Sequence, residues 1–182
     1  MNAARVPDII DVEASGFGRG SYPIEVGIAL ASERTACFLV RPEPDWTHWS
    51  PEAQALHGIT REILHTRGQP PELVANALNE LLAQRTVYTD AWGVDSSWLA
   101  LLHDRAGIPA RYRIEALSTL LDEEQRADWA GLKSRVRNEM GLERHRASAD
   151  ALVLQRAYLA CIARPRQARA LRGVSAAGPG SP

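Results

Sequence analysis

Ile9-Ile10-Asp11-Val12-Glu13, near the start of the chain, combines an apolar run with two acidic side chains. A short apolar run of this kind predicts a β-strand, and residues two apart in a strand point to the same face. Asp11 and Glu13 should therefore project together at the carboxyl end of the strand, where α/β sheets commonly bind ligands. A carboxylate that ends a buried run is costly without a cation or a partner. The alternative is two solvated acids at a strand end.

The segments that follow predict a mixed sheet with helices packed on it. Residues 24–30 carry apolar side chains at every second position, which is typical of a half-buried strand. Three further short strands are expected, at residues 35–40, 86–89 and 112–117. Helices are expected where apolar residues recur at helical spacing or a capping residue precedes them, at 51–57, 70–84, 95–105, 118–140 and 147–163, with a short element from Ile59. This order predicts an α/β or α+β sandwich around a five-stranded mixed sheet flanked by helices.

Composition predicts one soluble domain. The chain has 182 residues, of which 45% are hydrophobic and 24% charged, as in ordinary globular proteins. It contains no apolar stretch near the roughly 18–20 residues of a membrane span and no long apolar segment typical of a signal peptide. We therefore expect a cytoplasmic domain over residues 1–163 that does not bind membranes, followed by a disordered basic tail at 164–182. Cys37 and Cys161 are expected to be buried thiols.

Charge is distributed unevenly along the chain. Residues 1–132 hold 11 basic and 19 acidic side chains, whereas residues 133–182 hold 10 basic and 3 acidic ones. The basic portion includes Arg146, directly after His145, and an arginine fork can bind two phosphate oxygens at once. The charge therefore indicates either contact with nucleic acid or a solvated helix face.

Two further acidic positions lie far along the chain from Asp11. Asp95 stands at an expected helix start, where Asp is normally a cap, and Asp90 competes with it for any functional role. Asp150 lies in the first turn of the last expected helix, for which Ser148 is the expected N-cap. Three carboxylates that meet near one point can hold two divalent cations, and such a pair of ions promotes attack on phosphodiesters.

His145 precedes Asp150 by five residues and is expected in the loop before the last helix. A loop histidine can move toward a nucleophilic water, whereas a carboxylate on a helix stays fixed for a metal ion. The pair therefore suits a general base and a ligand, respectively.

Together these motifs resemble, in the same order, those of the DEDDh 3′–5′ exonucleases. This RNase H-like group includes the proofreading subunit of bacterial DNA polymerase III, RNase T and oligoribonuclease. The resemblance covers about residues 8–160 and rests on Asp11-x-Glu13, His57-Gly58-Ile59-Thr60, Asp95 and His145-x4-Asp150. It implies an RNase H-like exonuclease fold, and a structural role for the His57 segment.

The resemblance also implies a mechanism. Two Mg²⁺ or Mn²⁺ ions would be held by Asp11, Glu13, Asp95 and Asp150, and His145 would act as the general base. The expected products are nucleoside 5′-monophosphates released from the 3′ ends of DNA or RNA. The chain departs from the family at residues 89–94, where many relatives carry a His-Asn pair. This departure leaves open whether Asp90 or Asp95 is the second-motif ligand.

Substrate contacts are expected from the turn Ala14-Ser15-Gly16-Phe17 and from Arg146. The family more often has Thr-Thr-Gly or Ala-Thr-Gly in this turn. Phe17 is expected either to wedge against the terminal base or to close the core. Trp46 and Trp49 are expected to pack on the domain, and stacking on bases is the alternative.

The expected partner is single-stranded or 3′-terminal nucleic acid, and because many relatives are homodimers a dimer is an open expectation. Two other functions remain open. One is a non-catalytic nucleic-acid-binding module on the same fold, which the basic C-terminal portion would suit. The other is a hydrolase of short oligonucleotides or dinucleotides.

Overall fold

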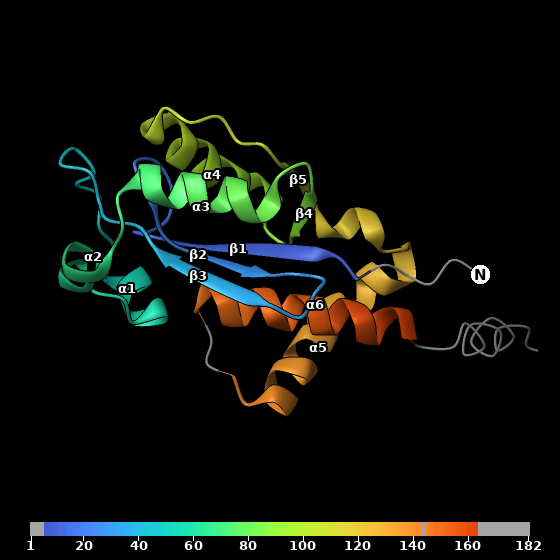
Figure 1. Cartoon of the computed structure of the whole chain (residues 1–182). Helices are drawn as coiled ribbons and strands as arrows, with labels where there is room; N and C mark the ends of the chain where they lie inside the picture. Colours follow the sequence, from blue (N-terminus) through green and yellow to red (C-terminus); the bar gives the residue numbers. More distant parts are fainter. Residues whose placement is uncertain (1–5, 143–144, 164–182) are drawn as a thin grey trace, which may run out of the picture.

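The computed structural model describes residues 6–142 and 145–163 of the chain. Within them, one five-stranded sheet has the order β3-β2-β1-β4-β5. Its strands are β1 (Asp8–Ala14), β2 (Pro23–Ala29), β3 (Thr35–Leu39), β4 (Thr86–Thr89) and β5 (Arg113–Ala116). β1, β2 and β3 form an antiparallel meander, and β4 and β5 run parallel to β1 (Figure 1). The expected α/β fold with a mixed sheet is confirmed.

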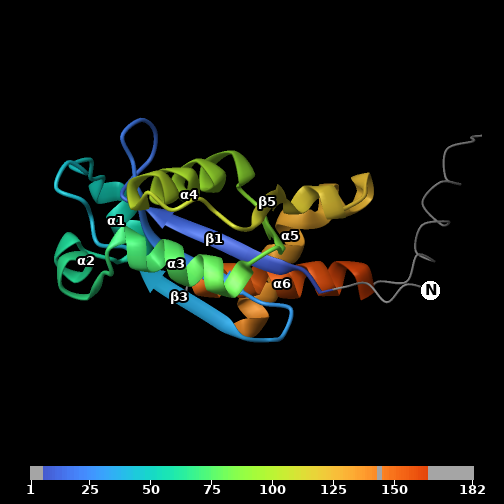
Figure 2. The ribbon, with the colours of Figure 1, turned by 45° about the horizontal axis from the view of Figure 1, so that its top comes forward.

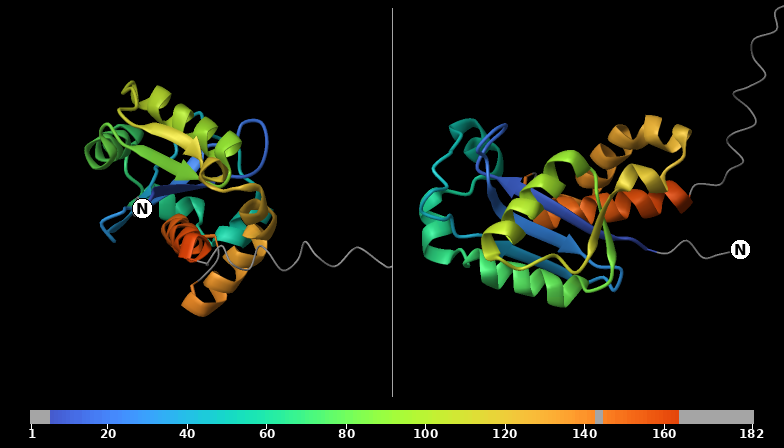
Figure 3. Two further views of the ribbon diagram at one scale, coloured as in Figure 1. Left: turned by 90° about the vertical axis from the view of Figure 1, so that its right-hand side faces the viewer. Right: turned by 90° about the horizontal axis from the view of Figure 1, so that it is seen from above.

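Helices cover both faces of this sheet, as the end-on view in Figure 3 shows. α3 (Pro71–Leu82) and α4 (Trp92–Ala106) lie on one face, and α5 (Glu123–Met140) and α6 (Ala147–Ala163) lie on the other. The short helices α1 (Pro51–His57) and α2 (Arg61–Arg67) lie beyond the end at which β1 terminates (Figure 2). The sheet is thus the middle layer of three.

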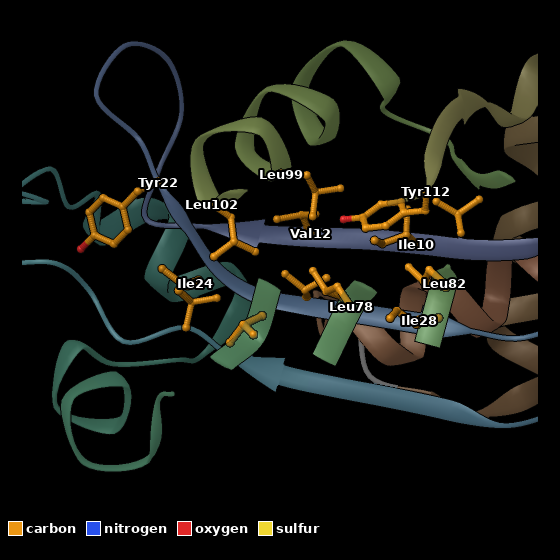
Figure 4. Packing of buried hydrophobic residues seen from close by; sticks show 14 of the residues in the cluster. Ile10, Val12, Tyr22, Ile24, Ile28, Leu78, Leu82, Leu99, Leu102 and Tyr112 are labelled. Carbon is orange, nitrogen blue, oxygen red and sulfur yellow. The ribbon is translucent and has the colours of Figure 1, made fainter. Parts of the chain in front are cut away.

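Each helical layer forms its own hydrophobic core with β1. Ile10 and Val12 pack with Leu78 and Leu99 under α3 and α4 (Figure 4). Ile9 belongs to the second core, with side chains of α5 and α6. Because successive residues of a strand face opposite sides, Asp11 and Glu13 lie on the same side as Ile9. The two acids therefore face the α6 layer.

Local sequence signals explain most of the element boundaries. The Ser50 hydroxyl accepts the Ala53 N–H at the start of α1, and Gly58, at φ 69°, ends that helix in the left-handed region. The Asp122 and Gln125 side chains form a capping box at the start of α5. These caps place the elements that carry the site.

Several expectations were wrong in detail. The helix expected over 118–140 is a 3₁₀ turn, η1 (Leu117–Leu120), followed by the separate helix α5. α4 begins at Trp92, three residues before the expected start. Ser148 is not a cap, because α6 begins at Ala147. The local pattern could not locate these boundaries, since propensities near helix ends differ by only tenths of a kcal/mol.

Two expected burial patterns were also wrong. All seven residues of β2 are buried, so the strand is not half-buried. α6 packs on the face of β2 that the alternating pattern assigned to solvent. Cys161 is buried as expected, but Cys37 is exposed because β3 is an edge strand.

No helix within residues 6–142 and 145–163 combines the length and the apolar character needed to span a membrane. The tail expected at 164–182 lies outside the described residues.

Candidate functional site

Asp11 and Glu13 lie near the carboxyl end of β1, where α4 and α6 also contribute acidic side chains. Burial raises the pKa of Asp11 well above its ordinary value, and the charges of Asp95, Asp150 and Glu13 raise it further. Burial, followed by the charge of Asp150, raises the pKa of Glu13 to about 8. These acids thus lie close enough to repel one another. The four carboxylates expected from the sequence come together at one place.

Asp95 belongs to this cluster. It lies in the first turn of α4, is only 2% exposed and accepts a hydrogen bond from the Thr89 hydroxyl. Burial raises its pKa to about 6, although the Thr89 hydrogen bond acts in the opposite direction. Its charge has the largest electrostatic effect on Asp11 of any neighbour. Asp95 is therefore a buried acid that is hydrogen-bonded to the end of β4 and coupled to Asp11, and not a solvated helix cap.

Asp90 has different partners. The Trp129 indole N–H donates to Asp90 Oδ1 at 2.6 Å, and the Lys133 ammonium group forms an ion pair with Oδ2. Both partners lie on α5, so Asp90 connects the end of β4 to that helix. Its charge still reaches Asp11, as the smallest of the acidic effects on that residue. Asp90 thus lies near the cluster, but both of its carboxylate oxygens are bonded to side chains of α5.

His145 and Asp150 are joined through the backbone. The His145 N–H donates to Asp150 Oδ2 at 3.0 Å, and His145 adopts a left-handed conformation with φ 59°. Glu13, His145 and Asp150 each offer one potential ligand atom, and these three atoms lie within 4.8 Å of one another. Carboxylate oxygens suit Mg²⁺ and Mn²⁺, and an imidazole nitrogen suits several transition metals. The donor set fits a divalent cation.

Two arginines from the basic portion of the chain reach buried acids. Arg137 on α5 forms an ion pair with Asp150, and both side chains are largely buried. Arg146 donates two hydrogen bonds to Glu25 Oε1 on β2, from Nη2 at 2.7 Å and from Nε at 3.1 Å. The side chain of Arg146 is 45% exposed. Arg146, expected to contact substrate, is thus bonded to protein on one edge and open to solvent elsewhere.

The turn after β1 is held rigidly except at its tip. Ser15 is buried and its hydroxyl accepts the Tyr22 N–H at 3.1 Å. A Cβ at Gly16 would lie 2.5 Å from the His48 ring, so only glycine fits there. Ala14 is also buried, whereas Phe17 is 67% exposed. Phe17 therefore does not close the core and remains available at the surface.

The other aromatic residues of this region are packed against protein. Trp46 is buried and stacks on Tyr22 with ring centroids 5.0 Å apart. The Trp49 indole N–H donates to Gln54 at 2.9 Å, and its ring meets His57 edge-on. His57 is buried and accepts the Ile59 N–H at 3.0 Å. The expectation that Trp46 and Trp49 pack on the domain is confirmed.

Sequence reasoning missed Glu25. It placed Lys133 and Arg137 in the basic portion of the chain, as contacts for nucleic acid or a solvated helix face, and missed their ion pairs with Asp90 and Asp150. A faint signal was present for Glu25, which interrupts the apolar run of β2 with a carboxylate. Lys133 and Arg137 are one helical turn apart, a spacing that puts both on one face of α5. Their acidic partners lie on other elements, and local spacing gives no access to these pairs.

Comparison with known proteins gives similarity at the level of structure. No protein-family model matches the chain, and no curated protein matches it in sequence. Among solved structures, E. coli exonuclease I in complex with a dT13 oligonucleotide matches with a TM-score of 0.65 at 16% identity, over 89% of this chain and 41% of that one. The chain has the fold of exonuclease I.

Other structures of exonuclease I agree. Exonuclease I from Methylocaldum szegediense matches with a TM-score of 0.65 at 15% identity, over 89% of this chain and 41% of that one. A zinc-bound E. coli exonuclease I–single-stranded DNA complex matches with the same TM-score at 16% identity and with the same coverage. The chain thus spans less than half the length of these exonucleases. At this level of identity the similarity establishes the fold alone.

Proposed function

We propose that this protein is a metal-dependent 3′–5′ exonuclease that releases nucleoside 5′-monophosphates from the 3′ ends of nucleic acids. One observation carries the proposal. Asp11 and Glu13 on β1, Asp95 on α4 and Asp150 on α6 converge beside His145, in a chain with the fold of exonuclease I. Such a concentration of buried and partly buried acids is costly unless cations neutralise it.

Two divalent cations fit this donor set. Asp11, Glu13, Asp95 and Asp150 would hold them, because hard carboxylate oxygens are the ligands that Mg²⁺ and Mn²⁺ prefer. When bound, such ions lower the pKa of a water molecule and stabilise charge on the attacking and leaving oxygens.

His145 would accept the proton of the attacking water. The water oxygen bonds to the terminal phosphorus as the bond from phosphorus to the 3′ oxygen breaks, and the 3′ oxygen takes up a proton from solvent. The hydrogen bond from the His145 backbone to Asp150 holds the base beside the acidic cluster. General-base catalysis of this kind contributes about 10²- to 10⁴-fold.

The substrate proposed is a single strand. Exposed Phe17, at the tip of the turn after β1, offers a surface for stacking on a terminal base. The exposed part of Arg146 supplies positive charge beside the acids. E. coli exonuclease I has been solved with a dT13 oligonucleotide, which favours single-stranded DNA over RNA as the first substrate to test.

The test is digestion of 3′- and 5′-labelled single-stranded DNA and RNA in the presence of Mg²⁺, Mn²⁺ or EDTA. We expect shortening from the 3′ end with either metal and none with EDTA, and 5′-monophosphates as products. A dinucleotide substrate in the same series would reveal a hydrolase of short oligonucleotides. Binding of DNA and metal without cleavage of any substrate would contradict the proposal and favour a non-catalytic binding module.

A further inference from the structure

Glu25 is a completely buried carboxylate in the middle of β2. It stands opposite Glu13 in the antiparallel register of β1 and β2, on the side of the sheet that faces α6. Glu13 is partly open to solvent, whereas Glu25 is not. A buried carboxylate is tolerated only when it is paired and hydrogen-bonded. Glu25 therefore depends on the groups that surround it.

Those groups come mainly from the two residues that follow His145. Arg146 donates to Glu25 Oε1 from Nη2 at 2.7 Å and from Nε at 3.1 Å, and the Ala147 N–H donates to Oε2 at 2.8 Å. The Cys37 thiol donates to Oε1 at 3.2 Å. Since Ala147 is the first residue of α6, Glu25 takes the role of a helix cap from a neighbouring strand. The first N–H of α6 is thus bonded to Glu25, and the expected N-cap Ser148 lies within the helix.

His145 is consequently held by two sets of contacts. On its C-terminal side, Arg146 and Ala147 are bonded to Glu25 on β2. Its own N–H is bonded to Asp150. It adopts φ 59°, a left-handed conformation that L residues rarely take and that persists only where the surrounding structure imposes it. Among the described residues, the contacts with Glu25 and Asp150 are the ones that act on this segment.

We infer that Glu25 is a positioning residue that sets the place and orientation of the His145 imidazole through Arg146 and the first N–H of α6. This inference rests on the proposed function for the meaning of that position, but the geometry itself can be tested without any activity. Because Glu25 occupies one edge of the Arg146 guanidinium, it also directs the exposed part of that side chain outward.

The chain offers a matched control in Asp8. Asp8 is also a buried acid in the sheet, and it accepts the Ala31 N–H at 2.7 Å and a hydrogen bond from Arg85 at 3.1 Å. It lies at the other end of β1 from the acidic cluster. Asp8→Asn and Glu25→Gln thus remove the same kind of charge. Each acid is paired with one arginine and one backbone N–H, Glu25 also accepts from the Cys37 thiol, and only Glu25 is connected to His145.

The experiment compares the wild type, Glu25→Gln and Asp8→Asn by NMR of ¹³C-labelled histidine rings. The chain has five histidines, and His145→Gln identifies the signal of residue 145. We expect this signal to move in Glu25→Gln and to stay in place in Asp8→Asn. We also expect kcat on labelled single-stranded DNA to fall at least tenfold in Glu25→Gln and less than twofold in Asp8→Asn. The dissociation constant for Mn²⁺ should change less than threefold in either.

An unmoved His145 signal in Glu25→Gln, or wild-type kcat, would overturn the inference. So would a collapse of Mn²⁺ binding in that variant, because Glu25 would then act on the acidic cluster as a whole. If the wild type cleaves nothing while the signal still moves in Glu25→Gln alone, the proposed function fails and the positioning geometry stands. Should Glu25→Gln not fold, Arg146→Lys carries the NMR part of the comparison, since an ammonium group cannot span both contacts of the fork.

Discussion

At the scale of single residues, the metal-free protein disfavours the charged form of Asp11, because burial and the neighbouring carboxylates raise the pKa of that group. We predict that Asp11→Asn or Asp150→Asn abolishes cleavage without unfolding the protein. Asp11→Asn should raise the melting temperature in EDTA, since it removes a repelled buried charge. Gel assays of cleavage and thermal melts check this, and retained cleavage in either variant would exclude the proposed metal site.

Substitutions can show which of Asp95 and Asp90 is the metal ligand. Asp95→Ala should abolish cleavage, because Asp95 is the neighbouring charge with the largest effect on the pKa of Asp11. Asp90→Ala loses the contacts with Trp129 and Lys133, which should cost about 1–2 kcal/mol of unfolding free energy while kcat falls only a few-fold. Urea denaturation and kcat measured in parallel test the assignment. It is reversed if Asp90→Ala is the inactive variant.

His145 has two conceivable roles, because its ring atoms are within reach of Glu13 and Asp150. As the general base, its loss in His145→Ala should lower kcat about 10²- to 10⁴-fold and leave Mn²⁺ affinity nearly unchanged. Titration with Mn²⁺ beside single-turnover kinetics distinguishes the roles. A parallel loss of metal binding would make the histidine a ligand.

At the scale of elements, the site depends on how closely α6 approaches β2. A Cβ on Gly27 would lie 2.0 Å from the Ala147 carbonyl carbon and 2.1 Å from the Ser148 nitrogen. Gly27→Ala must therefore displace the start of α6, which we expect to cost about 1–3 kcal/mol of unfolding free energy and most of the cleavage activity.

The matched control for that substitution is Gly131→Ala on α5, where the nearest atom to the new Cβ is the Arg135 Nη1 at 3.5 Å. An alanine within a helix is favoured over glycine by about 0.5–1 kcal/mol. We therefore expect this variant to be slightly stabilised and fully active. Equal losses in both variants would show that the contact between α6 and β2 has no special role.

At the scale of the whole molecule, the acidic cluster links stability to pH. The pKa values of Glu13, about 8, and Asp95, about 6, exceed their unfolded values, so the folded protein binds more protons than the unfolded chain between about pH 4.5 and 8. Stability of the metal-free protein should therefore decrease as pH rises through this window, by up to about 1.4 kcal/mol per pH unit for each group.

Thermal melts in EDTA from pH 5 to pH 8.5 measure this slope. Saturating Mg²⁺ should reduce it, since bound cations replace the protons, and Glu13→Gln should reduce it without metal. A melting temperature that is independent of pH in EDTA would show that these carboxyl groups are not destabilised in the folded protein.

Most of the fold could be predicted because its signals are local. Apolar alternation, the Ser50 cap and the Gly58 and Gly107 helix ends lie within the elements that they define. The expected site residues Asp11, Glu13, Asp95, His145 and Asp150 also come together in space. The sequence could not show that α6 buries the second face of β2, because burial depends on which distant segment packs there.

The order of strands and helices thus follows from local signals, since periodicity and caps act over a few neighbouring positions. The candidate acids were selected by the resemblance of their motifs, in order along the chain, to a known family. Only the tertiary structure decided which partners those acids have. Glu25 meets Arg146 across 121 positions, and Asp90 meets Lys133 across 43. Such pairs form when packed layers bring distant segments together, and their electrostatic energy depends on distance and burial, which local sequence does not encode.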